Sequence, residues 1–512
     1  MKKRKLASVT AVLLAACMFL GACSQSGGES SASAGGDASS GAAGTESAAS
    51  ESAEPLAINM MVGFDGVEFP QPGNEIQTMI EEYTNTKLDI QAYPGSTLHE
   101  MLPTLIASDE LPMVVSYGGS QLKTTYMVNA MKTGVFWDVT DYIQDYPNIA
   151  SISDLTWETF AINGRNYGIP RERGLARNAV GYRYDWLENL GMEEPETVYD
   201  LYEMMLAFAE QDPDGNGQDD TYGTITSPLD YFAIYLGAPN NWKYEDGQMI
   251  KNNETEEYME ALDMCRELYA RGALHPEYAI QERSQYEALW TEGKAGSYCN
   301  INNFAQFVML DETAVVHAKG VFSSDNGTFT AAGTGHNGVL SFSTTAVPDE
   351  ETLKGVLNFF DKLGDPEMCN LLGLGIEGKH YNVEDGVAVP VADMQDDFQN
   401  NIYMPYSAAM ACVYPDTRTM EVQRDELSAR TLEILEENEP YAVADPTQGL
   451  ISETYTEMGA DLDTILKDAV TKYIMGEIDK DGYLAEVQNW KDRGGAKVAE
   501  EYAAAYEERL GE

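Results

Sequence analysis

The residues from Asp212 to Asp220 have the types and spacing of a loop that could hold a hard cation. The run reads Asp-Pro-Asp-Gly-Asn-Gly-Gln-Asp-Asp, so oxygen-bearing side chains stand at its first, third and fifth positions. Alternate residues of a tight loop point inward, and a glycine at the sixth position, here Gly217, allows the sharp turn of the first half of an EF-hand loop. These carboxylates would repel one another without a cation, so the sequence predicts a structural calcium ion.

The predicted metal ligands are those at the odd-numbered loop positions: Asp212, Asp214, Asn216, Gln218 through its carbonyl, and Asp220. The loop departs from the EF-hand pattern at its twelfth position, where Gly223 replaces the usual bidentate glutamate. A solvated loop of Asx turns without metal is the alternative. A cage closed by protein oxygens leaves little room for a substrate, so no catalytic role is expected.

Cys23 is a second candidate for chemistry, after the Asp212 loop. Four basic residues, Lys2 to Lys5, precede an apolar stretch from Leu6 to Ala22, which is short for a membrane span and has the layout of a secretory signal. The stretch ends in Leu-Gly-Ala-Cys, which resembles the bacterial lipobox. The resemblance implies that residues 1–22 are removed and that Cys23 is acylated, anchoring the chain to the outer face of the cell membrane.

Residues 24–54 form the next segment, which consists almost entirely of Ser, Gly, Ala and Glu. Such a composition cannot bury enough apolar surface to fold, so residues 23–54 are predicted to be a lipidated cysteine followed by a disordered linker.

The charge of the chain excludes one class of partner. Its 512 residues carry 32 Lys and Arg against 84 Asp and Glu, a formal net charge of −52, so no basic stripe is available to neutralise phosphates, and nucleic acid is not an expected partner. The folded part is too long for one hydrophobic core and predicts two lobes. A monomer is expected.

No residues mark an enzyme. Cys265, Cys299, Cys369 and Cys412 are widely spaced and predict no disulfide, and Cys265 lies on an apolar helical stripe that is typical of a core. The histidines show no metal-ligand spacing, and no carboxylate pair is distinguished as acid and nucleophile.

Strands and helices are predicted to alternate along the chain. Residues 56–62, 88–92 and 113–117 read as strands. Residues 198–210 read as a helix capped by Thr197 with Asp200 three residues on. Further helices are predicted around 353–363 and 462–473, and the alternation favours an α/β sheet.

Several segments together resemble the family-1 bacterial extracellular solute-binding proteins, above all the lipoprotein branch that includes alginate-oligosaccharide binders. The segments occur in the family's order over nearly all of residues 55–512, and they are 108–115, 163–170, 182–191 with 195–197, 292–296 and 375–381. In that branch a calcium loop of this kind is known, although its acidic tenth position is Thr221 here.

The resemblance implies an α/β fold of the type II periplasmic-binding-protein kind, with two hinged lobes and a ligand cleft between them. By analogy the chain crosses between lobes near residues 168, 337 and 395. The expected first lobe is therefore 55–168 with 338–395, and the expected second lobe is 169–337 with 396–512.

The resemblance also places ligand contacts at strand ends that face the cleft, where aromatic rings would stack on sugars and polar groups would pair with hydroxyls. The expected contacts are Phe64, Asp65, Tyr117, Gly118, Arg171, Glu172, Trp242, Tyr298, Asn300 and Asn302. Arg171, Arg173, Arg177 and Arg183 form a basic cluster, which indicates either a clamp for uronate carboxylates or charge balance against nearby surface acids.

The resemblance implies that the chain captures a carbohydrate, most simply an oligosaccharide, and delivers it to the permease subunits of an ABC importer without altering it. A surface glycan-degrading enzyme and a carbohydrate receptor without a transport role are the alternatives.

Overall fold

The computed structural model describes residues 54–218, 220–299 and 313–511. The first lobe is built on a five-stranded sheet of order β2-β1-β3-β13-β4. Its strands are β1 (Leu56–Gly63), β2 (Thr86–Tyr93), β3 (Val114–Gly118), β4 (Ile169–Glu172) and β13 (His336–Phe342). β1 runs parallel to β2 and β3, and β13 is antiparallel to both β3 and β4.

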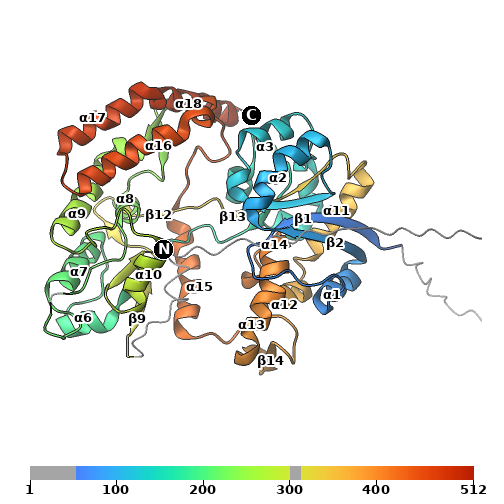
Figure 1. Cartoon of the computed structure of the whole chain (residues 1–512), viewed down its shortest axis with the longest axis horizontal. Coiled ribbons are helices and arrows are strands. Elements are labelled where there is room, and N and C mark those ends of the chain that lie inside the picture. Colours follow the sequence, from blue (N-terminus) through green and yellow to red (C-terminus); the bar gives the residue numbers. More distant parts are fainter. Residues whose placement is uncertain (1–53, 219, 300–312, 512) are drawn as a thin grey trace, which may run out of the picture. The chain divides into compact units, whose positions relative to one another are not determined.

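This sheet is apolar on both faces and is covered on both. In β1, Met60 and Val62 pack into one core cluster and Met61 into another, as the alternation of a strand requires. Helices α2 (Gly95–Ser108) and α3 (Thr125–Lys132) cover one face, and α1 (Glu75–Thr84) lies on the other (Figure 1). The remaining helices of this lobe are α4 (Pro147–Ala150), α5 (Asp154–Phe160), α11 (Glu350–Lys362), α12 (Pro366–Leu374), α13 (Gln395–Phe398) and α14 (Ala408–Met410).

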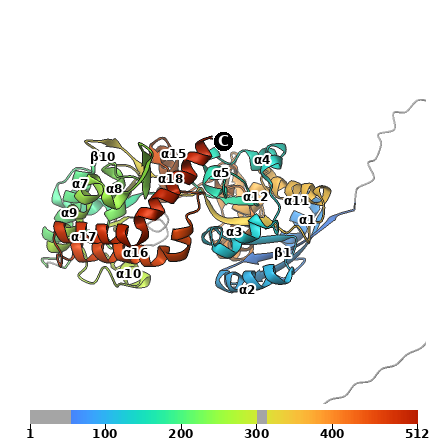
Figure 2. The same ribbon diagram turned by 90° about the horizontal axis from the view of Figure 1, so that it is seen from above.

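The second lobe has a three-stranded antiparallel sheet of order β8-β5-β9 and a large helical core. Its strands are β5 (Val180–Arg183), β8 (Ser297–Cys299) and β9 (Val316–Lys319). Its helices are α6 (Tyr184–Leu190), α7 (Val198–Glu210), α8 (Leu229–Tyr235), α9 (Glu256–Ala270), α10 (Arg283–Thr291), α15 (Glu426–Asn438), α16 (Glu453–Ile474), α17 (Lys480–Trp490) and α18 (Ala496–Gly511). The last three lie side by side (Figures 1 and 2).

Four short strand pairs complete the described strands. They are β6 (Trp242–Glu245) with β7 (Gln248–Lys251), β10 (Ser323–Ser324) with β11 (Gly327–Thr328), β12 (Thr330–Ala331) with β16 (Ala442–Val443), and β14 (Tyr381–Glu384) with β15 (Val387–Pro390).

The predicted elements agree with the observed ones where the local signal is strong. Helix α7 has the predicted bounds, and its capping box is present: the Asp200 N–H donates to Thr197 Oγ1 at 3.1 Å, and the Thr197 N–H donates to Asp200 Oδ2 at 2.9 Å. The three predicted strands correspond to β1, β2 and β3, and the two later helices to α11 and α16.

The division into lobes differs from the expected one at two of the three crossings. β4 pairs with β13, so residues 169–172 lie with the first sheet, and Ile402 and Tyr406 pack in that lobe's core. The chain leaves the first lobe after β4, returns just before β13 at residues 332–335, and leaves again before α15. Strand pairing and core packing over long sequence distances decide these points.

All four described cysteines are free and buried. Cys265 is fully buried in the second core, as its stripe predicted, and burial raises the pKa of its thiol. Within the described ranges, no helix combines the length and apolar character needed to cross a bilayer.

Candidate functional site

A large cavity lies beyond the carboxyl end of β3. Its volume is about 1010 Å³, and its first-lobe wall is the start of α3, residues Lys123 to Thr125. In open α/β sheets, ligands bind outside the carboxyl ends of the strands where the strand order reverses, which here is between β1 and β3. The opposite wall comes from the second lobe and its connections, and it includes Asp230, Asn241, Trp242, Lys251, Asp445, Thr447, Tyr455, Asp463 and Lys467.

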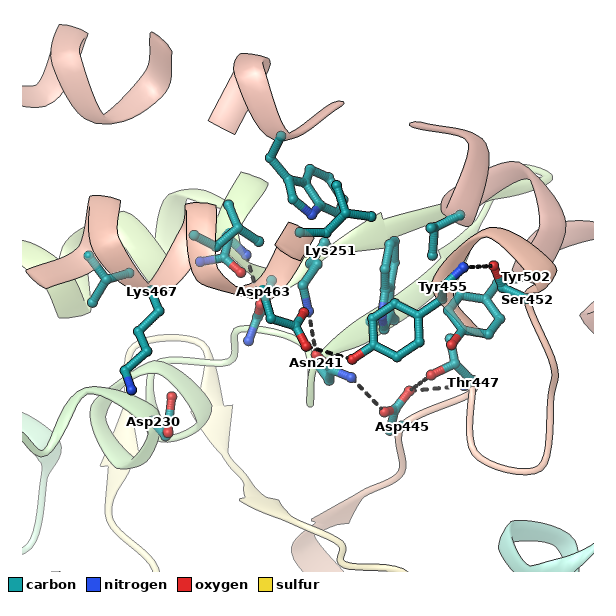
Figure 3. A pocket seen from close by; sticks show the side chains of 18 of the residues that line it. Asp230, Asn241, Lys251, Asp445, Thr447, Ser452, Tyr455, Asp463, Lys467 and Tyr502 are labelled. Atoms are coloured by element: carbon teal, nitrogen blue, oxygen red, sulfur yellow. Dashed lines mark hydrogen bonds between the residues drawn. The ribbon is translucent and has the colours of Figure 1, made fainter. Parts of the chain in front are cut away.

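One part of this wall is a chain of hydrogen-bonded polar side chains (Figure 3). The Lys251 ammonium donates to Asn241 Oδ1, and Asn241 Nδ2 donates to Asp445 Oδ2 at 2.9 Å. The other oxygen of Asp445 accepts from the hydroxyl and the N–H of Thr447 at 2.7 and 2.9 Å. Each group fixes the next, so the wall presents oriented donors and acceptors of the kind that pair with ligand hydroxyls.

Tyr455 supplies an accessible aromatic ring in the same wall. It lies in the first turn of α16, where its N–H donates to the capping hydroxyl of Ser452 at 3.0 Å, and its own hydroxyl donates to Asp463 Oδ2 at 2.7 Å. Its side chain is 40% exposed, whereas Trp242 is only 4% exposed and packs edge-on against Tyr502 with centroids 5.7 Å apart. Tyr455 can therefore stack on a ligand, and Trp242 supports the wall.

The charges around the cavity are balanced. The acidic and basic residues that line it are three lysines and three aspartates: Lys123, Lys251, Lys467, Asp230, Asp445 and Asp463. Burial lowers the pKa of Lys123 to about 8, although Asp445 opposes this shift. Burial also lowers the pKa of Lys251 and raises that of Asp230. Such a site suits a neutral, hydroxyl-rich ligand better than a highly charged one.

Of the expected ligand contacts, Trp242 lines this cavity. Phe64 and Asp65 follow β1 as expected but have other partners. The Phe64 ring is buried and meets Phe69 edge-on at 5.3 Å, and Asp65 Oδ1 accepts the Gly95 N–H at 2.8 Å.

The contacts expected after β3 and in β4 are also used within the first lobe. Tyr117 is buried, with its hydroxyl 2.9 Å from Ser341 Oγ, and Gly118 ends the strand beside it. The Arg171 guanidinium donates to the carbonyls of Ala408 and Tyr117, and burial lowers its pKa to about 10.

Glu172 lies at the end of β4, and burial raises the pKa of its carboxyl group. Its Oε2 accepts the Tyr414 N–H at 2.9 Å. Tyr298 is buried in the core beneath α10. Asn300 and Asn302, like Cys23, lie outside the described residues.

Asp445, Tyr455 and Asp463 were not among the expected contacts. The cap at Ser452 signals where α16 begins, but nothing local indicates that this helix end faces the β6–β7 hairpin and the start of α3. The one signal in the sequence was an aromatic residue, Tyr455, placed three positions after a serine that can cap a helix.

The Asp212 loop brings its predicted side chains together. Asn216 Nδ2 donates to Asp214 Oδ2 at 2.7 Å and to Asp220 Oδ1 at 3.1 Å, and the Gly217 N–H donates to Asp212 Oδ2 at 3.0 Å. The turn depends on Gly217, whose φ is +77°. The Gln218 N–H donates to Asn216 Oδ1 at 2.7 Å. The Gln218 carbonyl, which is the predicted metal ligand, takes no part in this hydrogen bond.

The partners of these residues bear on whether the loop suits a cation. Asp212 Oδ1 is buried and has no hydrogen-bond partner among the described residues, which is the state of an oxygen that lacks its ligand. Lys294 Nζ lies 2.6 Å from Asp220 Oδ2 and supplies positive charge at the other end of the loop. The tenth-position hydroxyl of Thr221 is bound to the Phe208 carbonyl at 2.7 Å.

Gly223 packs its backbone on Met205, where an added Cβ would lie 2.1 Å from the carbonyl oxygen, so the twelfth position cannot carry a long acidic ligand. Throughout the described residues, no three His, Cys, Asp or Glu side chains form a complete metal site. The loop therefore offers oxygens at its odd-numbered positions up to the ninth and lacks the ligands beyond them.

Comparisons with known proteins agree with this architecture. The profile of the family described as "Bacterial extracellular solute-binding protein" matches residues 67–350. The chain is 34% identical to the polygalacturonan/rhamnogalacturonan-binding protein YtcQ of Bacillus subtilis (strain 168), over 84% of this chain and 87% of that protein. It is 31% identical to lipoprotein LipO of the same organism, over 90% of this chain and 94% of LipO.

Among solved structures, the fold resembles that of the S. pneumoniae ABC-transporter substrate-binding protein FusA, solved as an EF-hand mutant in complex with fructo-nystose. The TM-score is 0.62 at 17% identity, over 89% of this chain and 99% of that one. At this identity the likeness establishes the shared two-lobed fold.

Proposed function

We propose that this chain, which belongs to the bacterial extracellular solute-binding protein family, captures an oligosaccharide between its lobes and delivers it to an ABC-type importer. Two relatives support a carbohydrate ligand: the name of YtcQ states polygalacturonan and rhamnogalacturonan binding, and FusA was solved with a fructo-oligosaccharide. Closure would be driven by a higher affinity of the closed state for the ligand.

The observation that carries the proposal is the cavity beside Tyr455. A stacking ring, a pre-oriented chain from Lys251 to Asp445, and balanced charge are what a neutral sugar requires. Its volume of about 1010 Å³ is large enough for more than one sugar ring. No step of bond cleavage is assigned to these groups, and the glycan is expected to leave unaltered, which separates this function from that of a glycan-degrading enzyme.

Membrane attachment is proposed through Cys23. The lipobox-like sequence and the name of the relative LipO support a lipid anchor, which would tether a monomeric binding protein outside the cytoplasmic membrane near its permease partners.

The proposal predicts that a matching oligosaccharide raises the melting temperature of the purified chain and that Tyr455→Ala weakens its binding about tenfold. The change removes a ring that can stack on the sugar and a hydroxyl that holds Asp463, interactions worth about 1–2 kcal/mol together. Thermal-shift screening of neutral oligosaccharides, followed by titration calorimetry of each hit, gives both values.

Tyr441→Ala is the matched control, because Tyr441 is 43% exposed and does not line the cavity. It should bind with wild-type affinity. Equal affinity of Tyr455→Ala and the wild-type chain would reject this cavity as the sugar site. Release of new reducing ends during incubation would instead establish an enzyme.

The Asp212 loop is proposed to bind a structural calcium ion. Asp212, Asp214, Asn216 and Asp220 would supply side-chain oxygens and Gln218 its carbonyl. When bound, the ion would supply positive charge that offsets the repulsion among the carboxylates. The loop follows α7, and none of its residues lines the cavity, so the ion's role is to stabilise the second lobe.

Removal of calcium by a chelator is therefore expected to lower the melting temperature by several degrees, since a ligand bound only by the native state stabilises it. Asp212→Asn should melt at the chelated temperature with or without calcium. Glu384→Gln, which alters an exposed acid on β14, should keep the full response. A wild-type chain whose melting temperature ignores both calcium and chelator has no such site.

A further inference from the structure

A second cavity, of about 880 Å³, has a different chemical character. It is bounded by α12, the β14–β15 hairpin and the π-helical segment 399–407 of the first lobe, and by α15 of the second. None of its lining residues lines the first cavity. Both lobes contribute to it, so it too would respond to their relative movement.

Two arginines line this cavity without an acidic partner. Within the described residues, Arg177 and Arg424 form no ion pair, whereas Arg165, Arg271 and Arg430 each pair with two carboxylates. In the same described ranges Arg171, Arg266 and Arg509 also lack an ion pair, but each donates to backbone carbonyls, so their guanidinium groups are satisfied within the fold.

The nearby acids are already engaged. Asp425, the one carboxylate that lines this cavity among the described residues, caps α15: it accepts the Ser428 N–H at 2.9 Å and the Ser428 hydroxyl at 2.5 Å. Asp397, close by, contacts His380 Nε2 at 2.9 Å and Lys379 Nζ at 3.0 Å.

A third arginine, Arg173, adds positive charge close to Arg177. The pKa of Arg173 is lowered by burial and further by the neighbouring charge of Arg177, so these guanidinium groups repel one another. An anion in the cavity would relieve that repulsion.

The rest of the wall is aromatic and apolar. Phe398 and Tyr403 lie with ring centroids 6.0 Å apart, and Tyr414 and Leu435 complete the surface. Such a wall favours the C–H face of a sugar ring, and it would add little to the binding of a bare inorganic anion.

We propose that this second cavity binds a carboxylate-bearing sugar, with Arg177 and Arg424 pairing with its carboxylate and the aromatic wall receiving its ring. Guanidinium groups match the planar, two-oxygen geometry of a carboxylate better than an ammonium does. The assignment goes beyond the oligosaccharide binding proposed above, which rests on the other cavity and on a balanced set of charges.

The test is titration calorimetry of the purified chain with the trimer of galacturonic acid as the probe. We expect Arg177→Gln and Arg424→Gln each to weaken binding about tenfold, and the fully methyl-esterified trimer, which has the same rings without charge, to bind at least tenfold more weakly than the acid. Arg493→Gln, which removes an exposed arginine elsewhere, should bind like the wild-type chain.

Two further measurements separate the alternatives. Tyr455→Ala should leave trimer binding unchanged, and loss of binding in that variant would place the acidic sugar in the first cavity and overturn the assignment. Inorganic phosphate that displaces the trimer at equal concentration would make the cavity a general anion site, which also overturns the assignment.

If Arg177→Gln does not fold, Arg177→Lys keeps the charge and should retain part of the affinity.

Equal binding of the trimer by the wild-type chain and both glutamine variants would reject the proposal. That result leaves the proposed function intact, since neutral oligosaccharides and Tyr455 test it separately. Conversely, failure of every neutral glycan to bind would reject the first site while the arginine variants still decide the second.

Discussion

Replacing Gly335 with alanine is expected to lower the free energy of unfolding by about 2–4 kcal/mol. Gly335 has a φ of +70° in the segment that returns the chain to the first lobe, and an added Cβ would lie 1.9 Å from Thr156 Oγ1. Thr156 is buried in α5, and its own Cβ would lie 2.9 Å from the added atom, so rotation of the hydroxyl alone does not relieve the contact. Urea denaturation followed by circular dichroism measures the loss.

Gly378→Ala is the matched control. Its φ is +78°, yet no atom lies within 4 Å of the position that a Cβ would occupy. The control should therefore cost only the backbone strain of a left-handed residue, about 1 kcal/mol. If the two substitutions cost the same, the contact with Thr156 has no energetic weight, and the packing described at this crossing is incorrect.

Acid is expected to weaken the fold through His336, the first residue of β13. Burial, helped by the positive charges of Lys123 and Arg171, lowers the pKa of this imidazole to about 4. The ring packs edge-on against Phe160 at 5.4 Å, and Nδ1 has no hydrogen-bond partner among the described residues.

Between pH 6.5 and 4, the unfolded chain binds a proton at this residue that the folded chain does not, so stability falls as the pH falls through that window. Above pH 6.5 both states are neutral, and the contribution vanishes. From pH 7 to pH 4.5 the loss from this one group is about 2 kcal/mol.

The measurement is the free energy of unfolding of the wild-type chain and of His336→Phe at pH 7 and pH 4.5. Many carboxylates also titrate in this range, so the informative quantity is the difference between the two proteins in their pH dependence. The variant should lose about 2 kcal/mol less on acidification. Identical losses would mean that His336 is protonated in the folded state as readily as in the unfolded one.

Local sequence signals predicted local structure well. The helix from Val198 to Glu210 has its predicted bounds because Thr197 and Asp200 satisfy the backbone groups of its first turn, which depends on nothing outside that turn. The strand at Leu56 and the core position of Cys265 likewise follow from the apolar pattern of their own segments.

The resemblance to a known family predicted the two-lobed fold, but it did not predict correctly where the chain crosses between the lobes. Residues 169–172 were assigned to the second lobe, yet β4 pairs with β13, more than 160 positions later in the chain. Such pairings depend on loop closure and packing over the whole lobe, and no local propensity encodes them.

The candidate site likewise has features that the sequence predicts and features that it does not. That Phe64 follows one strand of the sheet and Tyr117 lies near the end of another could be inferred from the sequence, because each lies at the end of an apolar run. Whether a residue at that edge faces a ligand or the core could not, and both rings are buried.

What the sequence determined by itself is what short stretches of chain can decide: the turn of the Asp212 loop, the helix caps and the alternation of strands and helices. Only the tertiary structure decided that Tyr455, Asn241 and Lys123, which come from distant parts of the chain, line one cavity. The physical reason is that a cap or an apolar stripe is satisfied within a few residues. A binding wall exists only where separate elements pack, and its side chains carry no local mark of their neighbours.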